Sequence, residues 1–196
     1  MRWMIIEGVD GSGKSTYARW IRQYYESRGE KVLIRIHPSE RFLGLLTRRT
    51  LQGKGRIMRL VASIFFIGDV LSSLRFLRKD RKRYGTLIYV RYLMATAYLP
   101  ERYIDLGYDF FAKILPVPRR LLLVDIDPGV AIRRIESRNE TKEMFEDLGS
   151  LVKIRGKVLK LASKGWTVIE NNEDADQMPV ALKRIIEDWD ATFPST

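Results

Sequence analysis

The sequence predicts one three-layer α/β domain, with a five-stranded parallel sheet that carries helices on both faces. Short apolar runs alternate with longer amphipathic segments, as strands and helices do in parallel α/β proteins. The chain has 196 residues, 45% hydrophobic and 30% charged, which suffices for one well-buried core. The sequence contains no repeat, low-complexity tract or linker that would divide residues 1–196.

The first half of the chain predicts three strands. An apolar run at residues 3–6 is the first, and a helix over 14–27 follows a glycine-rich loop. The second strand is expected at 32–36, after a turn at Gly29. Two helical segments come next, over about 41–51 and 55–77, separated by a Gly-Lys-Gly break. A buried strand at 87–90 closes this half.

The second half repeats the alternation. A helix is expected from about Tyr92, followed by a connection containing Pro116 and Pro118, and then a fourth strand at 121–124. Asp127 and Pro128 are typical of a helix cap and first turn, and they start a helix that reaches 137. The remaining elements are expected as a polar break at 139–142, a helix over 144–163, a strand at 167–169 and a final helix over about 175–189.

The charge of the chain narrows the choice of partners. The formal net charge is +11, which indicates an acidic partner: a nucleic acid, a membrane surface or a small polyphosphate. Residues 75–83 hold six basic residues opposed only by Asp80. The simplest interpretation is a solvated helix end whose cations complement the helix dipole. Nucleic-acid binding is the less favoured alternative, because no stacking pattern or nucleic-acid motif accompanies the run.

The composition also excludes several kinds of site. The chain has no cysteine, which rules out disulfides, thiolate metal sites and cysteine nucleophiles, and its single histidine cannot supply a histidine-rich zinc centre. The first residues run directly into an apolar strand without a charged leader or an apolar stretch of about 20 residues. We therefore expect a cytoplasmic protein.

The strongest chemical signal is a glycine-rich motif between the first strand and the first helix. Residues 8–15 read Gly-Val-Asp-Gly-Ser-Gly-Lys-Ser, a full match to the P-loop pattern. Such a loop turns backbone N–H groups toward phosphate oxygens, and the following helix adds the positive end of its dipole. Lys14 is expected to reach the β- and γ-phosphates of ATP, and Ser15 to place its hydroxyl on Mg²⁺. The predicted ATP-binding residues here are Gly8, Val9, Asp10, Gly11, Ser12, Gly13, Lys14, Ser15 and Thr16.

Beyond this loop, the sequence resembles the thymidylate kinases of the nucleoside-monophosphate kinase group over most of its length. Residues 7–16 match the opening of that family almost letter for letter. Phe66 occupies the position of the aromatic that stacks on thymine, and Arg91-Tyr92 that of the arginine that holds the acceptor phosphate. Further matches, in the order of the family, are Ala97-Tyr98, Asp127-Pro128, Arg134, Arg138, Phe145-Glu146 and Arg155.

This resemblance implies a P-loop kinase fold and a division of labour. Lys14, Arg91 and Arg138 are the expected catalytic residues, with Arg138 in a short lid at about 138–143 that closes over the donor phosphates. Arg134 is expected to pack on adenine. The expected acceptor-binding residues are Phe66, Asp69, Arg91, Tyr92 and Tyr98.

The departures from the family pattern all lie on the acceptor side. The chain has Ile36-His37 where the family has Arg-Glu, and Val90 where the family has an aspartate near Mg²⁺. Val70 and Leu99 replace an arginine and an amide that read the base. Asp10 and Asp69 are candidates to replace the missing carboxylate near magnesium.

Two functions therefore remain open from the sequence. The first is a phosphotransferase that moves the γ-phosphate of ATP, with Mg²⁺, onto thymidylate or a related phosphorylated small molecule. The second is an ATP-binding regulatory or nucleic-acid-associated protein without kinase turnover. ATP and the acceptor are the expected partners, with no membrane, and a homodimer is left open.

Overall fold

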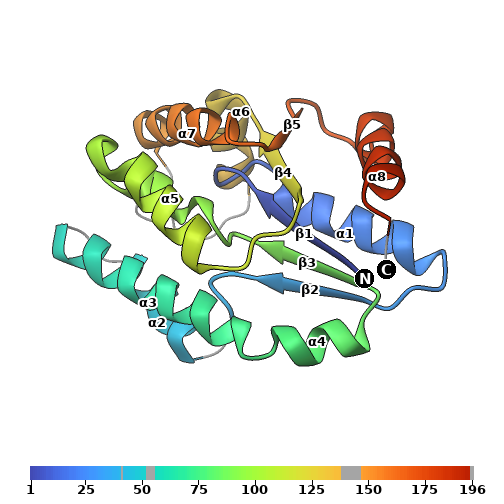
Figure 1. The fold of residues 1–196 in the computed structure, drawn as a ribbon. Helices are drawn as coiled ribbons and strands as arrows, with labels where there is room; N and C mark the ends of the chain where they lie inside the picture. The colour runs from blue at the N-terminus through green and yellow to red at the C-terminus, as the bar shows by residue number, and fades with distance from the viewer. Residues whose placement is uncertain (41, 52–55, 138–146, 195–196) are drawn as a thin grey trace.

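The five predicted strands form one parallel sheet in the order β2-β3-β1-β4-β5. The structure is a computed structural model, and it describes residues 1–40, 42–51, 56–137 and 147–194. The strands are β1 (Arg2–Glu7), β2 (Val32–Ile36), β3 (Thr86–Val90), β4 (Arg120–Asp125) and β5 (Thr167–Glu170). The predicted five-stranded parallel sheet is therefore confirmed (Figure 1).

Helices cover both faces of this sheet (Figure 1). One face is covered by α1 (Lys14–Glu26) and α8 (Val180–Thr192). The other face is covered by several helices, and α2 packs on α3 at one side of this layer. They are α2 (Phe42–Leu51), α3 (Arg56–Leu74), α4 (Leu77–Arg83), α5 (Ile104–Ile114), α6 (Pro128–Glu136) and α7 (Leu148–Ala162).

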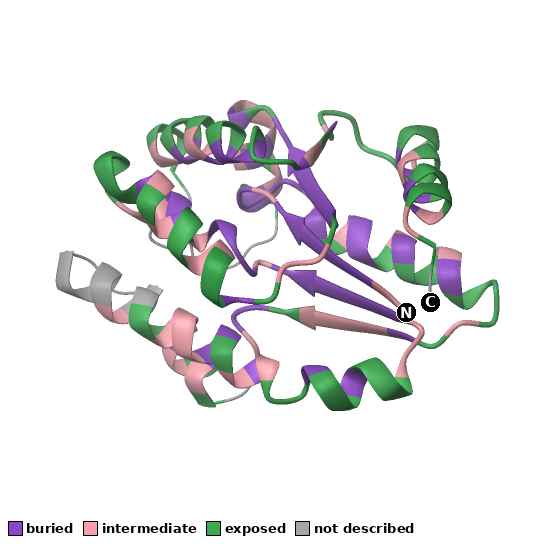
Figure 2. Ribbon diagram, viewed as in Figure 1, coloured by how far each residue is buried: buried purple, intermediate pink, exposed green. Residues whose placement is uncertain are grey.

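The side chains of β1 explain how one strand serves two cores. Met4 and Ile6 point into the cluster under α1 and α8, whereas Trp3 and Ile5 point into the opposite cluster. All four are buried, as are the neighbouring strands β3 and β4 (Figure 2). Because successive side chains in a strand face opposite sides, a central strand with helices on both faces must be apolar throughout.

The carboxyl ends of all the strands lie at one edge of the sheet, because the sheet is parallel. The first strand in sequence, β1, sits in the middle, between β3 and β4. Connections leave β1 and β3 in different directions at this point, and open α/β sheets bind their ligands at such a position.

The largest difference from the sequence prediction follows β3. A helix is predicted from about Tyr92, but the chain instead forms two short 3₁₀ helices, η1 (Met94–Tyr98) and η2 (Glu101–Tyr103), before α5 begins at Ile104. The predicted start of the helix is therefore wrong by about a dozen residues.

Glu7 provides the physical reason. Its Oε1 atom accepts hydrogen bonds from the backbone N–H groups of Tyr92, Leu93 and Met94, at 2.6, 2.7 and 3.1 Å. The preceding residue, Arg91, has a φ of 58°. With these hydrogen bonds in place, residues 91–93 form a bend rather than a helical turn, and the chain continues into the short η1.

The basic run lies mainly on α4. Its six cationic side chains are exposed, whereas Asp80 is buried and accepts hydrogen bonds from Arg35 of β2. Three of the cations, Arg81, Lys82 and Arg83, occupy the last turn of α4, where positive charge complements the helix dipole. Nucleic-acid binding by this run stays the less favoured alternative.

Two further expectations concern the termini of elements. Asp127 caps α6 as predicted, because its Oδ1 accepts hydrogen bonds from the backbone N–H groups of Gly129 and Val130. The expected lid at 138–143 lies outside the described residues. In the described parts of the chain, no helix has both the length and the apolar character needed to cross a membrane.

Candidate active site

The glycine-rich loop joins β1 to α1 at the carboxyl edge of the sheet, and its glycines are needed for their backbone shape. Gly11 and Gly13 have φ angles of 78° and 84°. A Cβ on Gly11 would lie 2.7 Å from the carbonyl oxygen of Ala131, and one on Gly13 would lie 2.5 Å from the Nδ2 atom of Asn171. Only glycine fits both the conformation and the space.

Lys14 occupies the first turn of α1 and is buried. Its Nζ atom donates to the carbonyl oxygen of Val9 at 3.0 Å and to Oδ1 of Asp10 at 3.2 Å. Burial and then the positive charge of Arg91 lower the pKa of Lys14 to about 8. The side chain thus rests against its own loop, and its ammonium group is easier to deprotonate than that of an ordinary lysine.

Asp10 joins the donor loop to the residue that follows β3. Its Oδ1 also accepts a hydrogen bond from Nη2 of Arg91. Burial alone would raise the pKa of Asp10, but the charges of Arg91 and Lys14 outweigh it and hold this pKa well below its usual range. Asp10 is therefore an ionised carboxylate between two cations.

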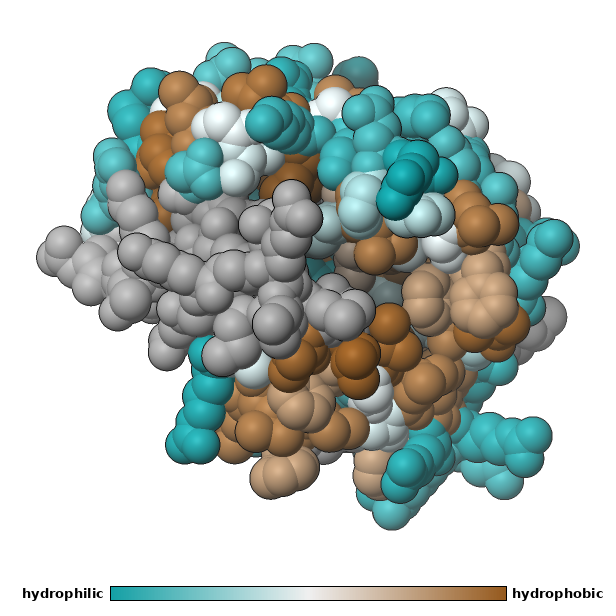
Figure 3. All heavy atoms as spheres, turned by 90° about the vertical axis from the view of Figure 1, so that its left-hand side faces the viewer, coloured by the Kyte–Doolittle hydropathy of each residue, from teal (hydrophilic) through white to brown (hydrophobic). Residues whose placement is uncertain are grey.

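A cavity of about 130 Å³ opens beside this charged group. The loop residues Gly8, Val9 and Asp10 form one wall, and Arg91 lines the same space. Figure 3 views the molecule from the carboxyl edge of the sheet, where apolar side chains form a broad exposed area. Most of the other lining residues are apolar, and they come from α3, η1, α5, α7 and neighbouring connecting segments.

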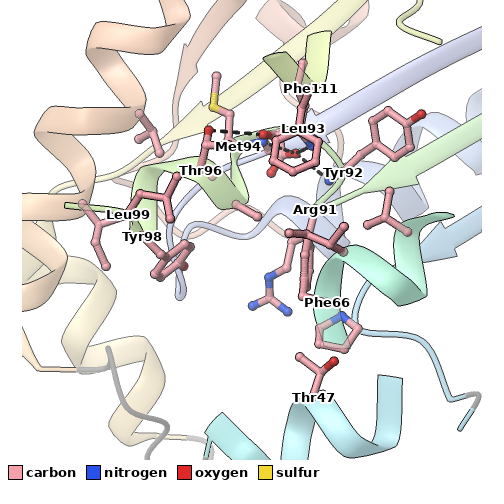
Figure 4. A pocket seen from close by; sticks show the side chains of 18 of the residues that line it. Thr47, Phe66, Arg91, Tyr92, Leu93, Met94, Thr96, Tyr98, Leu99 and Phe111 are labelled. Carbon is pink, nitrogen blue, oxygen red and sulfur yellow. Dashed lines mark hydrogen bonds between the residues drawn. The ribbon is translucent and has the colours of Figure 1, made fainter. Parts of the chain in front are cut away.

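Four of the five predicted acceptor residues line this cavity: Phe66, Arg91, Tyr92 and Tyr98. The side chain of Arg91 points into it, between Phe66 and Tyr98 (Figure 4). Tyr92 contributes through its ring, because its hydroxyl donates to the carbonyl oxygen of Pro116 at 3.0 Å. The structure thus brings together side chains from α3, from the segment that follows β3, and from η1, which lie far apart in the sequence.

Asp69, the fifth predicted acceptor residue, does not line the cavity. Its side chain is fully buried, and its carboxylate accepts hydrogen bonds from the His37 ring and from the backbone and hydroxyl of Ser39. Burial opposes ionisation, but these hydrogen bonds lower its pKa. The carboxylate of Asp69 is thus engaged in hydrogen bonds to His37 and Ser39 of the same chain.

Arg134 lies on α6 and is held by the segment that follows β5. Its guanidinium donates to the backbone oxygens of Asn171 and Glu173, at 3.1 and 2.9 Å, and to the carboxylate of Asp174. Nδ2 of Asn171 in turn donates to the backbone oxygen of Ser12 in the glycine-rich loop, at 2.8 Å. Arg134 is thus tied to the donor side of the site, with its guanidinium committed to hydrogen bonds.

Two residues of this site were not singled out from the sequence. Glu7 holds the chain after β3, and burial raises its pKa more than the three amide hydrogen bonds and Lys14 lower it. Asn171 braces the loop from the end of β5. Both stand at carboxyl ends of parallel strands, so a search for polar residues at that edge would have found them.

Ser15 is the residue that the sequence predicts to hold magnesium. Within the described ranges, no group of three or more histidine, aspartate or glutamate side chains is placed to hold a metal ion. Mg²⁺ at nucleotide sites usually takes one or two protein ligands and completes its shell with phosphates and water. The exposed Ser15, in the first turn of α1, fits that pattern. Arg138, the predicted lid arginine, lies outside the described residues.

Comparison with known proteins gives a consistent result. A family model described as thymidylate kinase matches residues 6–178. A thymidylate kinase of Leptospira borgpetersenii is 28% identical over 184 residues, covering 90% of this chain and 88% of that protein. A probable thymidylate kinase of Archaeoglobus fulgidus is 26% identical over 188 residues and covers 94% of each chain.

Among solved structures, a thymidylate kinase from Candida albicans has a TM-score of 0.70 to this chain. The match covers 97% of this chain and 92% of the other, at 16% sequence identity. At that identity the likeness shows a shared fold.

Proposed function

The chain belongs to the thymidylate kinase family, and on that premise we propose that it transfers the γ-phosphate of ATP to thymidylate. The observation that carries the proposal is the shared wall between the two halves of the site. The glycine-rich loop and Arg91 line one cavity, and Asp10 links them. A donor phosphate on the loop would therefore lie next to an acceptor phosphate held by Arg91.

The reaction asks little covalent chemistry of the protein. An oxygen of the acceptor phosphate attacks the γ-phosphorus, the bond from that phosphorus to the β–γ bridging oxygen breaks, and ADP leaves with the electron pair. The attacking oxygen is already anionic, so the protein needs only to align the groups and neutralise their charge. Lys14 and the loop amides would do this for the donor, and the guanidinium of Arg91 for the acceptor.

Lys14 and Arg91 must change partners when substrates bind. Both cations now contact Asp10, which keeps them in place in the free protein. Phosphate groups that enter the site carry more negative charge than one carboxylate and would compete for both. Asp10 thereby serves as a stand-in anion that prepositions the two cations.

Magnesium would be held by the hydroxyl of Ser15 together with the phosphates, and it would neutralise charge that develops on the β- and γ-oxygens. Arg138 is the proposed cation of the closing lid, and Arg134 is proposed to support the adenine side. These three roles rest on the motif and on the family resemblance.

The pocket for the base is proposed to be weakly selective. Val70 and Leu99, which replace two base-reading polar residues of the family, both line the cavity beside Phe66. An apolar wall rejects a wrong base poorly, because rejection depends on buried polar groups left without partners. Thymidylate is the first candidate, with slow and promiscuous turnover expected.

The regulatory alternative is not favoured, because the family and its named relatives are kinases. It predicts tight ATP binding without phosphate transfer. A cytoplasmic location and a homodimer stay predictions from the sequence.

A panel of nucleoside monophosphates with ATP and Mg²⁺, monitored by ADP formation, tests the proposal. Thymidylate is expected to stimulate ADP release, with other monophosphates within about a hundredfold of it in kcat/KM. Tight ATP binding without ADP formation from any monophosphate would overturn the proposal in favour of the regulatory alternative.

A further inference from the structure

A buried polar network lies directly behind the acceptor pocket. The chain's single histidine, His37, has its Nδ1 atom 2.9 Å from Oδ2 of Asp69 and its Nε2 atom 3.3 Å from Oγ of Ser73. Asp69 and Ser73 are 0% exposed, and His37 is 1% exposed. A polar cluster this deep is costly unless its members satisfy one another, so its geometry is tightly defined.

The hydrogen bonds assign the proton on one side of the ring. Ser39 donates to Asp69 through both its backbone N–H and its hydroxyl, and these bonds favour the ionised carboxylate. A carboxylate can only accept, so Nδ1 of His37 must carry a proton. The ring is therefore fixed in its orientation by a charged partner on α3.

Serine, histidine and aspartate in this order resemble a hydrolytic triad, but the surroundings exclude that role. Ser73 is fully buried and does not line the cavity. Its hydroxyl donates to the carbonyl oxygen of Val70, one turn back in α3, at 2.7 Å. A nucleophile needs access to substrate and a base that takes its proton, and Ser73 has neither.

The network connects instead to the walls of the cavity. The backbone N–H of His37 donates to the carbonyl oxygen of Val90 at 3.0 Å, immediately before Arg91. The next residue, Pro38, lines the cavity. The rings of His37 and Phe66 pack edge to face, with their centroids 6.4 Å apart. Phe66 lies between Arg91 and Thr47 in Figure 4.

We propose that His37 is a positioning residue for the acceptor: clamped between Asp69 and Ser73, it fixes the wall formed by Pro38 and Phe66 opposite Arg91. The wall consists of a loop after β2 and one face of α3, and Ser39 of the loop also donates two hydrogen bonds to Asp69 of α3. His37 ties these two elements to the end of β3, so that the base-binding wall and the phosphate-binding arginine keep a constant separation. This role rests on the proposed function, because it assumes that the cavity takes the acceptor.

A pair of substitutions at His37 isolates the hydrogen bond to Asp69. In His37→Asn the amide nitrogen sits near the position of Nδ1 and can still donate to Asp69, whereas in His37→Gln it sits near the position of Nε2. We expect the Gln variant to raise the KM for thymidylate by about tenfold, with a smaller change in kcat and unchanged ATP binding. The Asn variant should recover a large part of that loss. Asp69→Asn should behave like the Gln variant.

A control separates positioning from general loss of stability. Asp190 of α8 accepts hydrogen bonds from Arg2 and Tyr25, in a second polar cluster that does not line the cavity. Asp190→Asn should lower the melting temperature without changing the KM for thymidylate. Equal KM increases in the Asp190 and Asp69 variants would overturn the proposal.

The single histidine also permits a readout that does not depend on turnover. A proton–nitrogen correlation spectrum of the imidazole should show a hydrogen-bonded proton on Nδ1 in the free protein. A ring protonated on Nε2 alone would overturn the proposal, and so would an unchanged KM in the Gln variant of an active kinase. Absence of thymidylate phosphorylation by the wild type would instead defeat the proposed function, with the spectrum still reporting on the network.

Discussion

The two halves of the site are built in different ways. The proposed phosphate cradle of the donor half is one continuous stretch, residues 8–15, formed by the backbone of the loop and the start of α1. The proposed acceptor half is assembled from Pro38, Phe66, Arg91 and Tyr98, which belong to four separate segments and line one cavity. A continuous site tolerates little change within its motif, whereas an assembled site can be rewritten one side chain at a time.

The departures from the family pattern agree with this contrast. The donor loop keeps every residue of its motif, whereas Val70 and Leu99 on the cavity wall, and His37 behind it, differ from the family pattern. Asp10 is the only described side chain for which an ion pair to each half is seen: Lys14 on one side and Arg91 on the other. Substitutions on either side of Asp10 should therefore separate the two functions.

The largest expected effect is on the donor side. Lys14→Ala removes the ammonium group that meets the donor phosphates, and kcat/KM should fall by at least about a hundredfold, as for the loss of one preorganised transition-state donor. Stability should change little, because the buried ammonium carries a desolvation cost that also lowers its pKa. Lys183→Ala, on an exposed part of α8, serves as the control in thermal melts and initial-rate measurements. Wild-type ATP affinity in the Lys14 variant would refute the donor site.

Arg91→Ala should act on the acceptor alone. Loss of a charge-assisted contact to the acceptor phosphate is expected to cost about 2–3 kcal/mol in thymidylate binding, with ATP affinity nearly unchanged. Arg91→Lys keeps the charge but not the planar fork, so it should recover only part of the loss. Calorimetric titration with each nucleotide measures the thymidylate and ATP affinities separately. A parallel loss of ATP affinity would show that Arg91 serves both the donor half and the acceptor half of the site.

The pKa of Lys14 predicts a pH dependence of the donor half. Its folded-state pKa, about 8, lies below the ordinary lysine value, so above pH 8 the free protein loses the charge that ATP needs. ATP affinity should fall by up to about tenfold per pH unit there. Folding stability should rise over the same window, because the unfolded state binds more protons. Titrations between pH 7 and 10 check this, with Lys14→Arg as the variant in which the decline should disappear.

The smallest effect is expected from base selectivity. Leu99→Gln returns an amide to the cavity wall and should increase discrimination between thymidylate and the other monophosphates by about tenfold, since a buried polar group penalises a base that leaves it unpaired. Leu99→Met keeps the wall apolar and should change nothing. Competition assays with paired monophosphates measure the ratio, and equal ratios in both variants would place base recognition elsewhere.

Local sequence signals predicted the parts of the structure that depend on near neighbours. The strands follow from apolar runs, the loop from its glycines, and the start of α6 from Asp127, whose cap partners are two and three residues away. The helix expected from Tyr92 failed because Glu7, 85 residues earlier, holds the backbone in another shape. No local pattern carries that information.

The same distinction applies to the site. The sequence assigned Phe66, Arg91 and Tyr98 to the acceptor from their positions relative to the strands and from the family resemblance, and all three line the cavity. Asp69 was assigned to the acceptor, but its carboxylate is buried and forms a hydrogen bond with His37, which lies 32 residues away in the sequence. A side chain's burial, and with it its availability to a ligand, is settled by tertiary packing.

The central claim is that a phosphoryl group passes across the cavity between the glycine-rich loop and Arg91. The most direct test follows the label from ATP carrying radioactive γ-phosphate, with thymidylate as the sole acceptor. We predict that the label appears in thymidine diphosphate with wild-type protein and is strongly reduced with Arg91→Ala. Label released only as inorganic phosphate, or transferred equally by both proteins, would contradict it.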